Sequence, residues 1–205
     1  MTVHLKIEIL RKMLTAAYET IEANVAYLNQ LDSATGDGDH GTSIVKAIRA
    51  AAKSVTDAPA EQSLKETIYN AGWAVMGEDC GSTSSLIGSF FMGMSEAVTS
   101  EELDAAASIA LFESGLAGVR KQTKAKIGDK TLMDALIPAV EQMSGKSDLK
   151  SALESAAAAA DGAKLTRDYV AKFGRARNLG ERSVGHIDAG ATSIALLFNA
   201  FAKNV

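Results

Sequence analysis

Apolar residues recur at three- and four-residue spacing through most of the chain, which is the pattern of amphipathic helices. In the last such segment, Ile194, Leu197, Phe198 and Phe201 occupy positions i, i+3, i+4 and i+7. The predicted helices cover, approximately, residues 5–28, 39–54, 60–76, 82–99, 100–121, 129–143, 148–172 and 188–203. Short connections between eight helices predict an antiparallel bundle or helical barrel.

Local signals place the ends of several of these helices. Pro59 suits the start of the third helix, because proline is favoured in a first helical turn. The acidic stretch 100–102, Ser-Glu-Glu, is a good start signal for the fifth helix. Asp129 is predicted to cap the sixth helix, and Ser144-Gly145 to end it.

Composition supports an all-α fold of one domain, residues 1–205. The chain is rich in alanine, has two prolines and is 5% aromatic, so the β-branched and aromatic signature of strands is missing. With 47% hydrophobic residues, 205 residues can bury a substantial core.

Charge and cysteine content narrow the class of protein. The net charge of −4 and the pI near 5.4 argue against a nucleic-acid binder. Cys80 is the lone cysteine and cannot form an internal disulfide, which favours a reducing compartment. The charged N-terminus does not read as a signal peptide, and no apolar run is long enough for a membrane span. A soluble cytoplasmic protein without membrane or nucleic-acid partners is expected.

The stretch LDSATGDGDHG places Asp32, Asp37 and Asp39 within eight residues, interleaved with glycines. Glycine lets the backbone fold tightly enough for the three carboxylates to face one point. Two carboxylates at ~4 Å repel by about 1 kcal/mol in water and about 4 kcal/mol at an effective dielectric of 20. A divalent cation removes this cost, and oxygen ligands select Mg²⁺, Ca²⁺ or Mn²⁺ over zinc.

Two other interpretations of this loop compete with metal binding. An EF-hand starting at Asp37 fails, because Ile48 stands where the bidentate glutamate is needed. Alternatively, Asp39 is an ordinary helix N-cap and the other aspartates form turns. Three aspartates so close together favour the metal, and Mg²⁺ commonly keeps positions for substrate phosphates, which points to a nucleotide.

Three further loops concentrate glycine, hydroxyl and charged residues. Residues 78–85 precede an apolar helix, and their small side chains suit either a phosphate site or routine capping. Residues 128–131 read as a helix start. The glycine-rich stretch 174–190 holds three arginines, which pair bidentately with phosphate or simply form a solvated face. His40 is a candidate phosphate contact, and His186 a weaker candidate ligand or base.

Together these loops resemble the L subunit of dihydroxyacetone kinase, the nucleotide-carrying component, through essentially the whole chain. The matching residues are Asp32-x4-Asp37-x-Asp39-His40-Gly41, Gly128-Asp129-Lys130-Thr131, Gly174-Arg175-Ala176 and Leu179-Gly180-Glu181-Arg182-Ser183-Val184-Gly185-His186-x-Asp188-x-Gly190. The resemblance implies a barrel of eight antiparallel helices with the nucleotide at one end.

The resemblance also implies roles for individual residues. Asp32, Asp37 and Asp39 would hold two Mg²⁺ ions against the phosphates of ADP or ATP, and Arg175 would neutralise phosphate charge as the catalytic residue. The positions implied to contact the nucleotide are His40, Gly41, Thr42, Ser43, Ser82, Thr83, Thr123, Leu132, Arg175, Asp188, Ala189 and Gly190.

The resemblance implies that this chain passes phosphate to a hydroxy-ketone held on a separate K subunit. A phosphotransferase-system M subunit rephosphorylates bound ADP in one branch of the family, and free ATP is used in the other. A homodimer is also compatible with the sequence. Two further functions stay open: a nucleotide-sensing regulatory subunit that binds a transcription factor, and a purely structural helical module.

Three positions depart from the family pattern. Residues 80–85 replace the usual Gly-Gly-Ala-Ser-Gly-Pro turn, Arg177-Asn178 replaces Ser-Tyr, and Ala189 replaces proline. The aspartate loop is intact, so nucleotide binding is expected to survive. The surface facing the substrate subunit is expected to differ, which allows a related ketose such as erythrulose as acceptor.

Overall fold

The computed structural model describes residues 3–205, which form nine α-helices and two 3-10 segments. The elements are α1 (Ile7–Ala23), α2 (Val25–Ser33), α3 (His40–Thr56), α4 (Leu64–Met76), α5 (Ser82–Glu96), α6 (Ala105–Gln122), α7 (Met133–Glu141), α8 (Leu149–Ala160), η1 (Asp161–Asp168), η2 (Arg175–Ser183) and α9 (Ala189–Lys203). One isolated antiparallel bridge joins Leu5 to Leu103. The all-α prediction is confirmed for the described residues.

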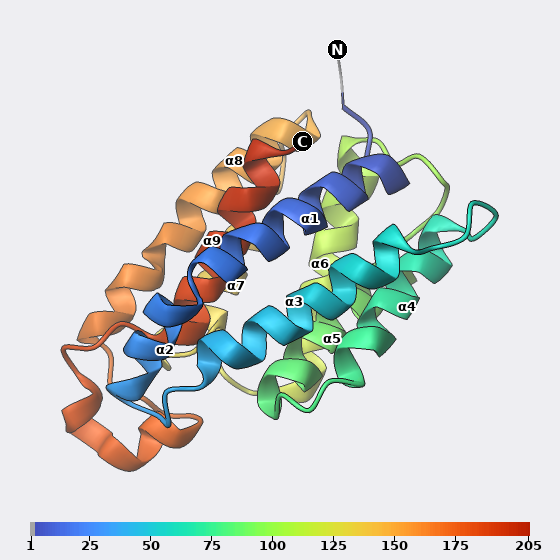
Figure 1. Cartoon of the computed structure of the whole chain (residues 1–205). Coiled ribbons are helices and arrows are strands. Elements are labelled where there is room, and N and C mark those ends of the chain that lie inside the picture. The colour runs from blue at the N-terminus through green and yellow to red at the C-terminus, as the bar shows by residue number, and fades with distance from the viewer. Residues whose placement is uncertain (1–2) are drawn as a thin grey trace.

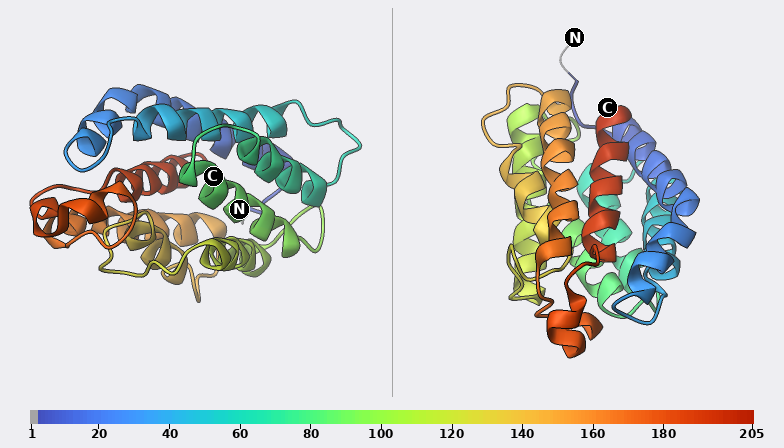
Figure 2. Two further views of the ribbon diagram at one scale, coloured as in Figure 1. Left: turned by 90° about the horizontal axis from the view of Figure 1, so that it is seen from below. Right: turned by 90° about the vertical axis from the view of Figure 1, so that its left-hand side faces the viewer.

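Eight of the helices close into a barrel, as Figures 1 and 2 show. Each packs against the next in the order α1, α3, α4, α5, α6, α7, α8, α9, and α9 returns to α1. Neighbouring helices run in opposite directions (Figure 1), and from α3 to α8 short loops connect each helix to the next. The short helix α2 continues from α1 at one end and packs on α3 and α9. None of the helices in residues 3–205 is long and apolar enough to cross a membrane.

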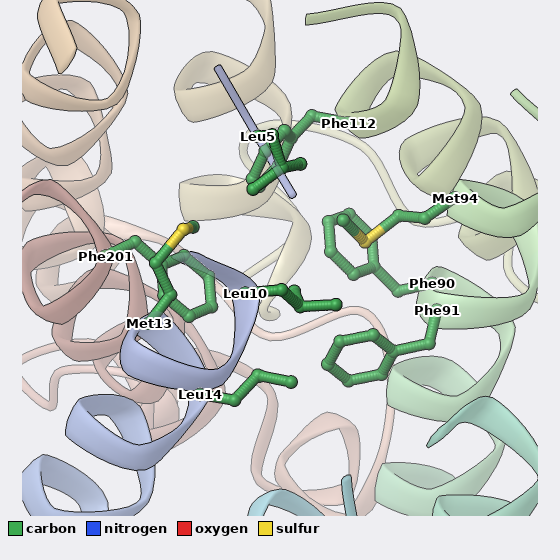
Figure 3. Close-up of a pocket in the computed structure, with 9 residues that line it drawn as sticks. All are labelled: Leu5, Leu10, Met13, Leu14, Phe90, Phe91, Met94, Phe112 and Phe201. Carbon is green, nitrogen blue, oxygen red and sulfur yellow. The ribbon is translucent and has the colours of Figure 1, made fainter. Parts of the chain in front are cut away.

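The barrel interior is filled by aliphatic and aromatic side chains rather than hollow. Phe112 of α6 lies among Phe90, Phe198 and Phe201, with ring centroids 6.2, 5.9 and 6.4 Å away. Figure 3 shows Leu10 and Leu14 of α1 facing the aromatic rings of α5 across a small space, with Met13 beside Phe201. Its volume is about 10 Å³, roughly one water molecule, and its walls are apolar. The core is therefore close-packed.

Glycines let the backbones of α5 and α6 touch. A methyl group at Gly118 would lie 2.4 Å from the carbonyl oxygen of Ser89, and one at Gly93 would lie 2.5 Å from that of Ser114. The hydroxyl of Ser114 also donates to the Gly93 carbonyl oxygen at 2.7 Å. Residues with a Cβ at either glycine would force the two helices apart.

Two predicted helices begin later than their sequence signals indicated. The third starts at Leu64 rather than near Pro59, because Ser63 and Glu66 form a reciprocal capping box. The fifth starts at Ala105 rather than at residues 100–102, because Asp104 caps it through the amide of Ala107 at 2.8 Å. In both cases a stronger side-chain cap lies a few residues downstream.

Three other predicted boundaries were wrong. The first helix breaks at Asn24, which separates α1 from α2. Asp129 does not cap the sixth helix: Lys130 has φ 60, outside the helical region, and α7 begins at Met133. The seventh predicted helix, observed as α8, ends at Ala160, and the chain continues as the 3-10 segment η1 to Asp168 instead of as α-helix to residue 172.

Replacing Gly118 by alanine is expected to lower the free energy of unfolding by about 1–2 kcal/mol. Overpacking against the fixed Ser89 carbonyl costs about 1–3 kcal/mol, and improved helix propensity offsets part of it. Urea unfolding measures the difference. Gly162→Ala is the control, since its added methyl group meets nothing within 4 Å. Equal unfolding midpoints for the two variants would contradict the close-packing argument.

Candidate functional site

Three carboxylates meet at one end of the barrel, where α2 leads into α3. Asp32, Asp37 and Asp39 each place one carboxylate oxygen within 4.8 Å of the other two. Opposite ligands of an octahedral Mg²⁺ with bonds of about 2.1 Å lie about 4.2 Å apart. The three aspartates therefore fit a small divalent cation with little movement, and oxygen-only ligands suit Mg²⁺.

The loop between the aspartates is closed by one of them. The Oδ2 atom of Asp32 accepts hydrogen bonds from the amides of Gly38 at 2.8 Å and Asp39 at 3.0 Å. A methyl group at Gly36 would lie 2.5 Å from Asp32 Oδ1, and Gly38 has φ +79. The glycines thus permit the tight turn that the sequence predicted, and Asp32 both organises the turn and faces its partners.

His40 ties the start of α3 to α9. Its Nε2 atom lies 3.1 Å from the hydroxyl of buried Ser193. Burial lowers the pKa of His40, while the nearby Asp32 and Asp39 carboxylates oppose the shift. Burial thus favours the neutral imidazole, which suits a hydrogen-bonding role better than that of a fixed cation.

Asn29 organises the residues that follow His40. Its Oδ1 atom accepts from the amide of Thr42 and its Nδ2 atom donates to the Thr42 hydroxyl, both at 3.1 Å. Gly41 packs closely against α2, because a methyl group there would lie 2.3 Å from the carbonyl oxygen of Val25. The amide of Ser43 donates to the main-chain carbonyl oxygen of Asp39 at 2.9 Å. Part of the hydrogen-bonding capacity of this first turn is therefore already used within the chain.

Arg175 reaches the aspartates from a distant part of the sequence. Its Nη2 atom lies 2.9 Å from Asp37 Oδ2, and both side chains are well exposed. The residue follows Gly174, whose φ of 62 turns the chain into η2. Arg177 and Arg182 in the same segment are also exposed. An exposed ion pair contributes little to stability. Its consequence for the site is that the Arg175 guanidinium lies beside the aspartates.

Asp188 and Gly190 form the beginning of α9 beside α7. The Asp188 carboxylate caps α9 by accepting from the amide of Ala191 at 2.7 Å. A methyl group at Gly190 would lie 3.4 Å from the amide nitrogen of Leu132. Burial raises the pKa of Asp188 to about 7, with the Asp134 and Asp32 carboxylates adding to the rise and the Ala191 hydrogen bond and the Lys130 charge opposing it.

Ser82, Thr83 and Thr123 make local contacts. Ser82 and Thr83 begin α5 after Gly81, whose φ is 57. Thr123 ends α6, and its hydroxyl accepts from the amide of Ala125 at 3.1 Å. The start of α5 and the end of α6 lie at the same end of the barrel as the aspartates (Figures 1 and 2).

The antiparallel order gathers four helix N-termini at this end. The helices α3, α5, α7 and α9 all begin here, as Figure 1 shows. Each N-terminus carries a partial positive charge and amides without intrahelical partners, which favour anions. The candidate end therefore combines three carboxylates whose spacing fits a divalent cation with several anion-favouring helix starts.

A separate hollow of about 320 Å³ lies between α2 and the stretch before Asp188. None of the residues expected to contact the nucleotide lines it. The lining residues are Tyr27, Gln30, Leu31, Ala34, Arg167, Gly185, His186 and Ile187. The side chain of His186 is exposed and is placed here rather than with the aspartates.

Sequence reasoning missed several side chains that support the site. Asn29 precedes Asp32 by one helical turn, so its place on the same face of α2 was a signal that could have been used. Ser193 pairs with His40 across 153 residues, and Thr166 accepts from the Asp188 amide across 22. The local spacing of residues does not predict pairs between positions so far apart in the sequence.

The sequence profile described as the DAK2 domain matches residues 34–203. The chain belongs to the DAK2 domain family. The match takes in Asp37, Asp39, Arg175 and the start of α9, and it begins two residues after Asp32.

Several DAK2 relatives align along nearly the whole chain. The ADP-binding subunit DhaL of PEP-dependent dihydroxyacetone kinase 1 from Listeria innocua is 38% identical over 183 residues, 89% of this chain and 88% of the relative. The corresponding Escherichia coli subunit is 32% identical over 200 residues, 92% of each chain. An L-erythrulose kinase from Pectobacterium atrosepticum is 34% identical over 194 residues, and the alignment covers 33% of that longer protein.

A solved structure shares the fold of this DAK2 domain. The dihydroxyacetone kinase of C. freundii, crystallised with AMP-PNP and Mg²⁺, superposes with a TM-score of 0.75 at 23% sequence identity. The superposition covers 100% of this chain and 35% of that one. The helical barrel is thus a fold seen by experiment in a larger protein.

Asp188→Asn is expected to change how stability depends on pH. The folded-state pKa lies near 7 and the unfolded value near 4, so the parent loses stability as pH rises between them. An asparagine at position 188 can still accept the capping hydrogen bond from the Ala191 amide, but it carries no charge. We expect similar stability of parent and variant at pH 4 and, at pH 8, a variant more stable by on the order of 4 kcal/mol.

Denaturant unfolding of metal-free protein across this pH range measures the difference between the two proteins. Taking the difference cancels titrations that the parent and the variant share. A difference that stays constant from pH 4 to pH 8 would show that Asp188 is ionised normally in the folded protein.

Proposed function

We propose that this DAK2 domain is the nucleotide-carrying phosphotransfer subunit of a dihydroxyacetone-type kinase. The observation that carries the proposal is the convergence of Asp32, Asp37 and Asp39 beside Arg175 at an end where four helices begin. Relatives named as ADP-binding subunits of dihydroxyacetone kinases, aligned over about nine tenths of the chain, support it.

The aspartate trio would hold Mg²⁺, and we propose two ions. The three carboxylates bring six oxygens in all, of which one from each aspartate lies within 4.8 Å of the other two, and Asp32 Oδ2 already accepts two amide hydrogen bonds. Bound Mg²⁺ would neutralise the charge of the polyphosphate and align it for transfer. The oxygen ligands, their spacing and the exposure of Asp37 and Asp39 to solvent all suit a metal that shares its coordination with phosphate.

The nucleotide, ADP or ATP, would lie across the helix starts. The first turn of α3 (His40–Ser43) and Ser82-Thr83 of α5 would face the phosphates, where helix N-termini favour anions. Thr123, Leu132 and residues 188–190 would line the remaining part of the nucleotide. Leu132 and Gly190 lie close enough for a flat ring to pass over both, since Gly190 lacks a side chain.

Arg175 would act as the catalytic residue. Its guanidinium lies against Asp37 at 2.9 Å, within reach of any phosphate that the same carboxylate helps to hold. Arginine presents planar paired donors that match phosphate oxygens. Charge on the transferred phosphoryl group is stabilised by such donors, and phosphoryl transfer depends mainly on this stabilisation and on positioning.

The acceptor would be held by a separate K subunit. A phosphotransferase-system M subunit or free ATP would restore the phosphate, and the chain would work in the cytoplasm. Dihydroxyacetone is the first acceptor to test, because relatives of matching length carry that name. Erythrulose is the second, because longer relatives are named erythrulose kinases. A homodimer of this chain is compatible with the proposal.

Reconstitution tests the function as a whole. The chain, mixed with a K subunit, Mg²⁺ and either ATP or the phosphotransferase components, is expected to phosphorylate dihydroxyacetone or erythrulose, and neither subunit alone should do so. Arg175→Gln is expected to lower the transfer rate by about 10³-fold, the scale of an arginine that stabilises a transferred phosphoryl group. Product is followed by mass spectrometry. Absence of turnover with every donor and acceptor, while nucleotide still binds, would instead favour a regulatory subunit.

Asp37→Asn is expected to abolish retention of Mg-nucleotide and keep the helical fold. Loss of one carboxylate removes a metal ligand and relieves repulsion among the three acids. In thermal melts, Mg-ADP at 100 times its dissociation constant should stabilise the parent by about 2.7 kcal/mol and the variant hardly at all. Asp57→Asn is the matched control, since Asp57 is exposed at the far end of α3. Equal stabilisation of Asp37→Asn and the parent would show that the metal assignment is wrong.

A further inference from the structure

The chain between Thr166 and His186 leaves the barrel and passes beyond its end before returning to α9. In Figure 1 it is the orange segment at the lower left, and the right view of Figure 2 shows it below the barrel. It contains η2 and carries Arg175, whose guanidinium reaches Asp37. We call residues 166–186 the arginine segment.

The arginine segment is fastened to the barrel by two neighbouring residues of one turn. The Asp129 carboxylate accepts from the Lys172 ammonium at 2.8 Å, and the Asp129 carbonyl oxygen accepts from the Lys172 amide at 3.1 Å. The Lys130 ammonium donates to the carbonyl oxygens of Thr166 and His186. Lys130 therefore holds both ends of the segment, and Asp129 holds a point near its start.

Both fastening residues are buried charges. Asp129 is 3% exposed and Lys130 is 2% exposed, although the turn that carries them lies at the surface end of the barrel. A buried charge is costly unless it is paired and hydrogen-bonded. The Asp129 carboxylate also accepts from the amide of Lys126 in its own turn at 3.0 Å, and the Asp134 and Asp188 carboxylates lie near Lys130. The other hydrogen-bond partners of the two side chains, Lys172, Thr166 and His186, belong to the arginine segment, so the burial of these residues and the seating of the segment depend on each other.

The turn holds a strained backbone in place. Lys130 has φ 60, a conformation that costs energy for a residue with a side chain. The carboxylate of Asp134 accepts from the amides of Gly128 at 2.6 Å and Thr131 at 2.7 Å, on either side of the strained residue. This conformation directs the Lys130 side chain inward to the two carbonyls.

Hydrogen bonds inside the arginine segment close it on itself. The buried hydroxyl of Ser183 accepts from the amide of Ala171 at 2.9 Å and donates to the Gly180 carbonyl oxygen at 2.7 Å. The amide of Gly185 donates to the Arg167 carbonyl oxygen at 2.7 Å. A segment cross-linked in this way moves largely as one unit, so a change at its fastening points is transmitted to Arg175.

We propose that Asp129 and Lys130 are positioning residues, a two-point clamp that seats the arginine segment over the end of the barrel so that Arg175 reaches the aspartate trio. The clamp itself concerns the free protein. Its consequence for nucleotide binding rests on the proposed function, and the two are tested separately.

The first experiment uses the full chain without metal or nucleotide. Limited trypsin digestion, followed by mass spectrometry, measures cleavage at Arg175, Arg177 and Arg182, which are exposed on the segment. Lys130→Met is expected to speed this cleavage about tenfold, because a lost charge-assisted contact raises the open population by that order. Lys172→Met should also speed this cleavage. Because the Lys172 side chain is 56% exposed, its replacement should leave the fold intact.

The matched control is Lys164→Met, which removes the same charge from an exposed position just before the segment. It should leave cleavage at the three arginines unchanged. Cleavage at Lys53, on α3, reports global unfolding and should stay at the parental rate in all variants. Equal cleavage of Lys130→Met and Lys164→Met, or a uniform rise at every site including Lys53, would overturn the clamp.

The second experiment asks whether the clamp acts through Arg175. Lys130→Met is expected to speed Mg-ADP dissociation about tenfold in the parent background and to have no further effect in an Arg175→Gln background. A purely structural role would show the same added effect in both backgrounds, and that result would overturn the positioning role. If the parent holds no Mg-nucleotide, the proposed function fails while the trypsin result still decides the clamp.

Discussion

Mutual repulsion of three carboxylates is the constraint around which this end of the protein is organised. Asp32, Asp37 and Asp39 are brought together by a turn that needs glycine and by two amides that donate to Asp32. Arg175 adds a positive charge against Asp37. In the absence of a cation, this convergence costs energy that the rest of the fold has to supply.

The barrel supplies that energy and also sets the direction of the local field. Its packed core, with glycine contacts between α5 and α6, fixes where each helix begins. Because neighbours alternate in direction, α3, α5, α7 and α9 all start at the aspartate end. Carboxylates whose spacing fits a divalent cation and helix starts that favour anions thus arise from one topology.

Apolar residues at helical spacing predicted an antiparallel bundle or barrel, and the family resemblance singled out the barrel. Glycines between the acids predicted the convergence of the aspartates. The sequence mispredicted the role of Asp129 because an aspartate after glycine reads as a cap, whereas its partner, Lys172, lies 43 residues away. The local sequence does not mark Lys130 as buried either, yet it is buried against two carbonyls 36 and 56 residues distant. Helix starts at Leu64 and Ala105 were missed where two local signals competed, and the stronger cap prevailed.

Under the proposed function, the order of binding follows from charge. A polyphosphate and three carboxylates repel each other, and the end of the barrel also holds Asp134 and Asp188, against which Lys130 and Arg175 are the nearby cations. Helix starts alone contribute only about 0.3–1 kcal/mol each toward an anion at a surface. Divalent metal must therefore accompany the nucleotide, and Arg175 has to exchange a carboxylate partner for a phosphate. Because Asp129 and Lys130 hold the arginine segment in place, the Arg175 guanidinium can rotate from the carboxylate to the phosphate while its backbone stays at the site.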